Sequence, residues 1–122
     1  WLLATEADDY RALDVGLYPL PDNAWTRGKC GYKALVYMAS GAVPVVSPVG
    51  VNAAIVEHGV RGFHARCDED WCDAVGRLLV DPELRAEMSV RGRAYVETHY
   101  SVRALQGAFV AALRDAAEAG VR

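Results

Sequence analysis

The chain has 122 residues and a mass of 13.2 kDa, which leaves room for one compact domain and excludes two full-sized domains with a cleft between them. Its hydrophobic fraction of 52% and charged fraction of 24% exclude a disordered or collagen-like chain, and no apolar run is long enough to cross a bilayer. The formal net charge is −3, so the sequence lacks the basic excess of a non-specific nucleic-acid binder or of a protein that binds anionic membranes. Any anionic ligand must therefore be bound by local groups.

The cysteines and histidines give no sign of a metal or redox centre. Three cysteines are an odd number without metal-type spacing, and no histidine has a carboxylate or cysteine at ligand spacing. No secretory leader is recognisable, so we expect a reducing, cytoplasmic environment, no metal and no cofactor. The sequence starts at Trp1 within what reads as domain sequence, and we interpret 1–122 as a single, partial domain.

The first half of the chain alternates between helix and strand signals. The expected elements are, in order, a short helix over 5–13, a buried strand over 14–20, a loop over 21–31, a helix from about residue 30 or 31 that ends at Gly41, a strand over 43–48, a loop over 48–52, a helix over 52–57 that is ended by Gly59, and a short strand over 62–65. Proline and glycine mark most of the boundaries.

The second half is predicted to be helical. One helix opens at Asp68 or Asp70, a second restarts at Asp81 and Pro82, and Ser101 caps a last one. The apolar residues of the last helix recur every three to four positions, at Leu105, Phe109, Leu113 and Ala116. We interpret this stripe as part of the core rather than as a groove for a partner.

The alternation of strands and helices predicts an α/β fold with a Rossmann-like parallel sheet covered by helices on both faces. Ligands bind such sheets outside the carboxyl ends of the strands. That rule points to two loops, residues 19–31 and 47–52.

The first of these loops has the residues of an anion site. Gly28 and Gly31 flank Lys29 and Cys30 where the loop becomes a helix, which would place free N–H groups and the positive end of the helix dipole at one spot. Lys33 lies four residues after Lys29, and Arg27 lies just before Gly28. A diphosphate fits this arrangement. The alternative is that the glycines only make the turn and the lysines only solvate a helix start, since the pattern is neither of the two common phosphate-binding glycine motifs.

Neighbouring polar and aromatic residues have alternative roles. Tyr18 and Trp25 are placed to stack on a base, but we expect them to pack against the loop. Asn52 is expected to cap its helix rather than to bind a sugar hydroxyl. Ser47, at the end of a predicted strand, is a candidate ligand contact.

A long stretch of the chain resembles a known family. The motifs PLPD, RGKCGYK, YMASG, SPVGVN and EHGVRGF occur in this order, and the likeness continues through DEDWCDAVGRLLVDPELRAEM to THYS. Together they closely resemble the donor-binding half of the group 1 family of retaining, nucleotide-sugar-dependent glycosyltransferases with the GT-B fold. The resemblance implies a C-terminal domain that binds the nucleoside diphosphate of an activated sugar, while a separate N-terminal domain holds the acceptor.

The resemblance also assigns roles to single residues. It implies that the amides of Gly31 and Tyr32 contact the diphosphate and that Lys33 keeps a phosphate role. Members of the family normally carry two glutamates eight positions apart at this helix, one toward the donor sugar and one toward the ribose. Those positions are Gly28 and Val36 here, and neither residue offers a carboxylate. The predicted donor-binding set is Arg27, Gly28, Lys29, Gly31, Tyr32 and Lys33, and no catalytic residue is assigned.

The resemblance implies further partners. The family's arginine and lysine for the leaving diphosphate lie on an earlier segment that this chain lacks, so we expect little or no transfer activity from the chain alone. The three strands match the last three of a larger sheet, and the strand at 14–18 would have an unpaired apolar edge that invites homo-oligomerisation. The alternative function is a non-catalytic nucleotide-binding or scaffolding module with the same fold.

Overall fold

The structure, a computed structural model, describes residues 4–120. Its elements follow the order α1 (Glu6–Arg11), β1 (Val15–Tyr18), α2 (Ala24–Arg27), α3 (Tyr32–Ser40), β2 (Val43–Val46), α4 (Asn52–Ile55), β3 (Phe63–His64), α5 (Asp68–Val80), α6 (Pro82–His99) and α7 (Val102–Ala119). Apart from α2, every element lies within or close to a range that the sequence predicts.

The three strands form one parallel sheet in the order β1-β2-β3. β2 lies in the middle, and its four residues are all buried, as expected of a strand covered on both faces. Val15 to Tyr18 of β1 pair with Val43 to Val46, whereas β3 joins the ladder only from Val45 onward. Within residues 4–120 the outer edge of β1 has no partner strand, and Leu17 on this strand is 49% exposed.

Helices cover both faces of the sheet, and each face has its own apolar cluster. α5 covers one face, where Leu78 packs with Val43, Val45 and Phe63. α3 and α4 cover the other, where Met38 packs with Val46 and residues of α4. Alternate residues of β2 therefore serve opposite clusters, as the two-residue period of a strand requires.

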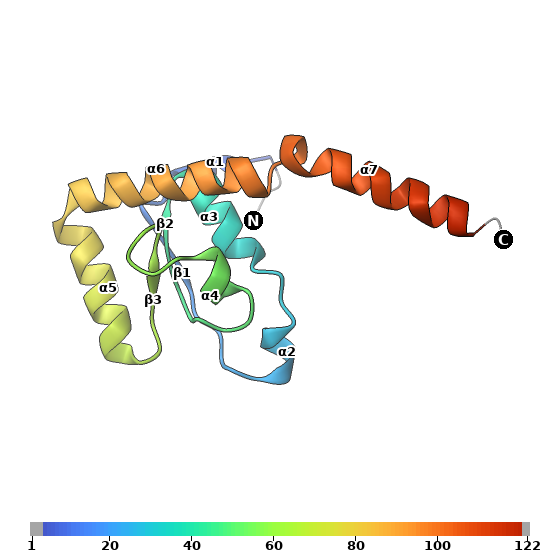
Figure 1. Cartoon of the computed structure of the whole chain (residues 1–122). Helices are drawn as coiled ribbons and strands as arrows, with labels where there is room; N and C mark the ends of the chain where they lie inside the picture. Colours follow the sequence, from blue (N-terminus) through green and yellow to red (C-terminus); the bar gives the residue numbers. More distant parts are fainter. Residues whose placement is uncertain (1–3, 121–122) are drawn as a thin grey trace.

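α6 crosses the amino ends of the strands, opposite the rim where the loops leave the sheet (Figure 1). The Ser89 hydroxyl donates to the carbonyl of Gly41, just before β2, at 2.6 Å, and Arg85 lies 3.6 Å from the carboxylate of Asp14, just before β1. Met88 of α6 enters the α5-side cluster, while Tyr95 packs against the α3-side cluster. α6 thus packs against the apolar clusters on both faces of the sheet and leaves the carboxyl ends of the strands open.

The interpretation of the last helix as a core stripe is wrong. α7 begins after the Ser101 cap, as predicted, but it projects from the body and has no buried residue in its described length (Figure 1). Phe109 and Leu113 are 65% and 55% exposed. The periodicity correctly indicated an amphipathic helix, but the described part of the chain offers no surface against which its apolar face packs.

None of the described helices is both long enough and apolar enough to cross a membrane.

Candidate functional site

The rim at the carboxyl ends of the strands brings together the two loops that the sequence singles out. Gly50 lies against the backbone of Arg27, so closely that a Cβ at Gly50 would lie 2.6 Å from the Arg27 carbonyl oxygen. Gly50 also has a φ of 57°, a conformation that side chains rarely adopt. The predicted juxtaposition of residues 19–31 and 47–52 is therefore present, and a glycine makes it possible.

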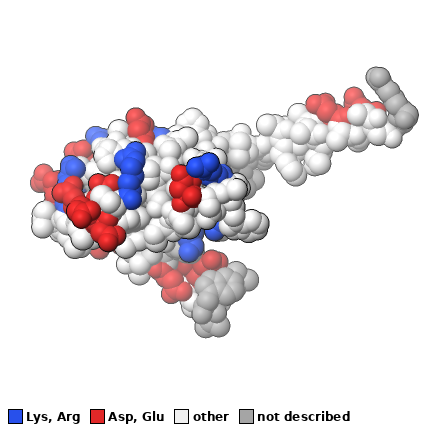
Figure 2. All heavy atoms as spheres, turned by 90° about the horizontal axis from the view of Figure 1, so that it is seen from below, with Lys and Arg blue, Asp and Glu red and all other residues white. Residues whose placement is uncertain are grey.

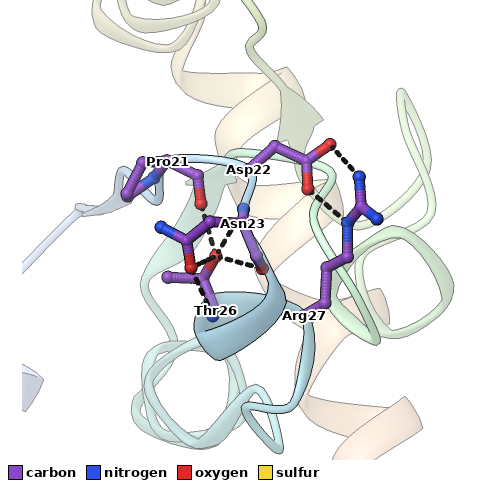
Figure 3. A network of polar contacts seen from close by, with 5 residues as sticks. All are labelled: Pro21, Asp22, Asn23, Thr26 and Arg27. Atoms are coloured by element: carbon purple, nitrogen blue, oxygen red, sulfur yellow. Dashed lines mark hydrogen bonds and ion pairs between the residues drawn. The ribbon is translucent and has the colours of Figure 1, made fainter.

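A short helix, α2, stands where the sequence predicts only a loop. Asn23 caps it: the Asn23 Oδ1 accepts the Thr26 N–H at 3.0 Å, and the Thr26 hydroxyl oxygen accepts the Asn23 N–H at 3.2 Å (Figure 3). The buried Thr26 hydroxyl also donates to the Pro21 carbonyl. The Asn-x-x-Thr spacing in the sequence indicates this reciprocal cap. It was missed because the segment is rich in turn-forming residues and was therefore predicted to be a loop.

Arg27 is held by Asp22. Its Nε and Nη2 donate to the two carboxylate oxygens at 2.6 and 3.1 Å, as Figure 3 shows. The guanidinium hydrogen bonds lower the pKa of the Asp22 carboxyl, and the carboxylate in turn raises the pKa of Arg27. Both side chains are exposed, so the pair orients the arginine more than it stabilises the fold. Arg27 therefore offers a partly neutralised charge at the rim.

The two glycines around Lys29 and Cys30 differ in structure. Gly28 is the C-cap of α2 with a φ of −82°, and an added Cβ would meet only ordinary contacts. Gly31 is buried, has a φ of 71°, and its Cβ would lie 2.6 Å from Cδ1 of Ile55. Of these two positions, only that of Gly31 requires a glycine. Its left-handed backbone and the absence of a side chain let the start of α3 lie directly against α4.

The start of α3 presents free donors. Among residues 4–120, no acceptor receives the N–H groups of Tyr32, Lys33 or Ala34, whereas those of Gly28 and Lys29 are taken by carbonyls of α2. Tyr32 is 62% exposed, and Lys29 and Lys33 are exposed as well. In the described part of the chain, no carboxylate lies within ion-pair distance of either lysine. The free backbone donors therefore lie in the first turn of α3, with Lys29 before this turn and Lys33 within it.

The aromatic residues lie differently from the expectation. Trp25 is 81% exposed, so the expected packing against the loop is wrong for this residue. The half-buried Tyr18 ring lies 5.9 Å from the Lys33 ammonium, a cation–π arrangement that holds the lysine over the end of β1. Tyr18 thereby links the sheet to the start of α3.

The expected capping role of Asn52 is also wrong. Val51 is the N-cap of α4, and Asn52 lies inside the helix with 1% exposure. Its Nδ2 donates to the Ser47 carbonyl at 3.4 Å, and its Oδ1 faces Gly31. The side chain ties the loop after β2 to the turn before α3, a role that only tertiary structure reveals.

A cleft of about 400 Å³ lies at the carboxyl ends of all three strands. It is lined by Leu20, Pro21, Asp22, Ser47, Pro48, Val49, Ala65 and Arg66. Of the residues singled out from the sequence, Ser47 lines it, but none of the six predicted donor-binding residues does. Applying the rule for parallel sheets to the third strand as well would have pointed to Arg66.

The charge around the rim is mixed. Figure 2 views the molecule from the side of α2 and the loops, and blue and red spheres lie next to one another over the body. Among the described residues, no group of three or more acidic, cysteine or histidine side chains is placed to hold a metal ion.

Comparison with known proteins identifies relatives of the chain, although no family model matches it. A D-inositol 3-phosphate glycosyltransferase from Saccharomonospora viridis is 31% identical over 109 residues, which are 88% of this chain and 24% of that protein. The structure resembles the C-terminal domain of a glycosyl transferase group 1 family protein, LpcC, from Francisella tularensis, with a TM-score of 0.64 and 25% identity. That match covers 76% of this chain and 46% of the solved one. The chain thus spans less than half of either protein.

Proposed function

We propose that this chain, a relative of the C-terminal domain of group 1 glycosyltransferases in both sequence and fold, binds the nucleoside diphosphate of an activated sugar. The donor-binding residues are Arg27, Gly28, Lys29, Gly31, Tyr32 and Lys33. In the whole protein, a second domain binds a hydroxyl acceptor, and the sugar is transferred to it with retention of configuration.

The observation that carries this proposal is the first turn of α3. The N–H groups of Tyr32, Lys33 and Ala34 have no acceptor within residues 4–120, and two exposed lysines without acidic partners stand beside them. A helix N-terminus has a partial positive charge, and its free amides bind phosphate oxygens. The overall charge of −3 provides no general attraction for an anion, so the diphosphate depends on local groups such as this turn.

The same groups suit the chemistry of the transfer. As the bond between sugar and diphosphate breaks, negative charge grows on the departing phosphate oxygens. Donors that are already oriented toward that charge stabilise the transition state more than the ground state. Gly31 precedes these amides, and its left-handed backbone lets the start of α3 lie directly against α4, where a side chain would clash with Ile55. The ammonium of Lys33, over Tyr18, is available for the diphosphate.

Two positions favour the alternative of a non-catalytic nucleotide-binding module. Gly28 and Val36 stand where the resembling family normally carries glutamates, so contacts to the donor sugar and ribose must come from other residues or are lost. The space at Gly28 is nevertheless open, and its backbone is in an ordinary helical conformation. A glutamate therefore fits there without strain, which makes the alternative testable.

Nucleotide binding is tested by calorimetry with UDP and GDP on the purified chain. We expect Lys33→Ala to weaken binding about tenfold, because a hydrogen bond to a charged group contributes roughly 1.5–3 kcal/mol. Lys29→Ala should have a smaller effect, because Lys29 lies before α3 whereas Lys33 lies in its first turn. Arg114→Ala, on the projecting helix α7, is the matched control. Equal affinities of all four proteins for both nucleotides, or no binding at all, would overturn the proposal.

The variant Gly28→Glu distinguishes a donor-binding domain from a non-catalytic scaffolding module. In a donor domain, the new carboxylate should strengthen binding of a nucleotide sugar relative to the bare nucleoside diphosphate, because it reaches only the sugar. In a scaffold, the ratio of the two affinities stays unchanged. A parallel assay of nucleotide-sugar turnover by the unmodified chain should show little or no activity.

A further inference from the structure

The loop after β2 and the start of α4 hold the loop after β1 in three places. The Ser47 Oγ accepts the Leu20 N–H at 3.0 Å, which fixes the beginning of the loop after β1. Farther along, the backbone of Arg27 lies against Gly50, and Gly31 lies against α4. The segment that joins α2 to α3 is therefore held at both of its ends.

Asn52, the first residue of α4, lies at the last of these contacts and is 1% exposed. Apart from aromatic residues, only one other polar side chain is buried within residues 4–120, that of Thr26. Thr26 belongs to the cap of α2, so both buried side chains lie in or against the loop between β1 and α3. Burying an amide costs free energy that hydrogen bonds must offset. Asn52 is thus a costly side chain at the place where this loop becomes α3.

The hydrogen bond of the Asn52 amide does not by itself explain this burial. Its Nδ2 donates to the Ser47 carbonyl at 3.4 Å, but that carbonyl already accepts the Val49 N–H at 2.8 Å. On the other side, the Asn52 Oδ1 would lie 3.1 Å from a Cβ at Gly31, so it lies close to the backbone of that glycine. The amide therefore stands between the loop after β2 and the residue that directly precedes the free N–H groups of α3.

We propose that Asn52 is a positioning residue for nucleotide binding: its amide holds Gly31 in place and thereby sets the direction of the free N–H groups in the first turn of α3. The physical reason for an amide is orientation. A hydrogen bond to Ser47 has a preferred direction, whereas the contacts of an apolar side chain have none. The inference rests on the proposed function and adds to it a residue from another segment that acts without touching the ligand.

The test compares stability with nucleotide affinity in Asn52→Leu, which keeps a branched side chain but removes the amide. We expect its free energy of unfolding in urea to stay at or above that of the wild type, because the Ser47 carbonyl keeps the Val49 N–H and no amide is left to desolvate. Calorimetry with UDP and GDP should show binding weakened about fivefold, the loss of one ordinary hydrogen bond to the anion. A side chain with only a structural role would instead lower stability and affinity together.

A second variant, Asn52→Asp, keeps the size of the side chain and adds a charge that depends on pH. At pH 8 its carboxylate should repel the diphosphate and weaken binding about tenfold relative to the wild type at the same pH. Burial raises the pKa of such a carboxyl, and the neutral form again donates a hydrogen bond to Ser47. The ratio of the two affinities should therefore return toward one when the pH is lowered to 5.5.

Ala53→Leu adds the same side chain at an exposed position of the same helix, so it is the matched control and should bind as the wild type does. Wild-type affinity in both Asn52 variants overturns the inference and leaves the proposed function standing, as does a loss of affinity matched by a loss of stability. If Asn52→Leu fails to fold, Asn52→Asp decides, and binding that stays weak at pH 5.5 overturns the inference. If the wild type binds neither nucleotide, the proposed function and this inference fail together.

Discussion

The body of the molecule and α7 carry similar helical patterns with opposite outcomes. In α5, apolar residues at helical spacing meet the sheet, and Leu78 has no exposed surface. In α7, residues at the same spacing remain in solvent, and Figure 2 shows the helix as mostly uncharged spheres with acidic ones near its end. Periodicity therefore determines which face of a helix is apolar, but the rest of the fold determines whether that face is covered.

The largest effect is expected from Leu78→Ala, which removes a side chain from the centre of the α5-side cluster. The substitution leaves a cavity that the surrounding side chains fill only partly, so we expect the free energy of unfolding to fall by about 3 kcal/mol. Urea denaturation monitored by circular dichroism measures it. A loss below about 1 kcal/mol would show that α5 packs less tightly on the sheet than the contacts indicate.

Gly31→Ala tests the close contact that supports the site. The left-handed backbone and the clash with Ile55 predict a loss of about 2 kcal/mol and weaker nucleotide binding. The matched variant Gly28→Ala should be neutral or stabilising by about 0.5 kcal/mol, because its backbone is already helical. Equal effects of the two substitutions in urea denaturation would contradict the difference between the two glycines.

The pH dependence of stability tests the packing of β3. Burial lowers the pKa of His64 below its usual value of 6.5, although its hydrogen bond with the Val56 carbonyl opposes the shift. In the unfolded chain this histidine takes up a proton near pH 6.5, whereas in the folded chain it does so only at lower pH. The unfolded state thus binds more protons in that window, and stability falls as the pH drops below about 6.5.

The measurement is the urea midpoint at pH 7.5 and pH 5.5 for the wild type and for His64→Gln. We expect the wild type to lose more stability than the variant between the two pH values, by less than about 1 kcal/mol because the ring is only partly buried. An equal loss in both proteins would assign the pH dependence to other groups.

Leu113→Ala on α7 should have the smallest effect, within about 0.5 kcal/mol, because the side chain is exposed and alanine is a good helix former. Urea denaturation of this variant and of the wild type measures the difference in the free energy of unfolding. A loss above 1 kcal/mol that grows with protein concentration would show instead that the α7 face is buried between copies of the chain.

Much of the fold was predictable because its signals are local. Pro19 and Gly41 mark element ends, and the apolar run at 43–46 reads as a buried strand. The first turn of α3 was predictable as a candidate site for the same reason, since Gly31, Lys29 and Lys33 lie within five residues. Asn52, Asp22 and Arg66 were harder to place, because Asn52 lies against the distant Gly31, and the other two line a cleft with residues that follow other strands.

The sequence by itself determined the order of the strands and of every helix except α2, the parallel sheet they imply, and the glycine and lysine residues around the start of α3. These features depend on side-chain periodicity, backbone conformation and capping, which act over a few neighbouring residues. Only the tertiary structure decided that Gly31 touches α4 while Gly28 does not, that three strand ends form a cleft, and that α7 stays uncovered. The reason is that contact and burial depend on which distant segments meet in space.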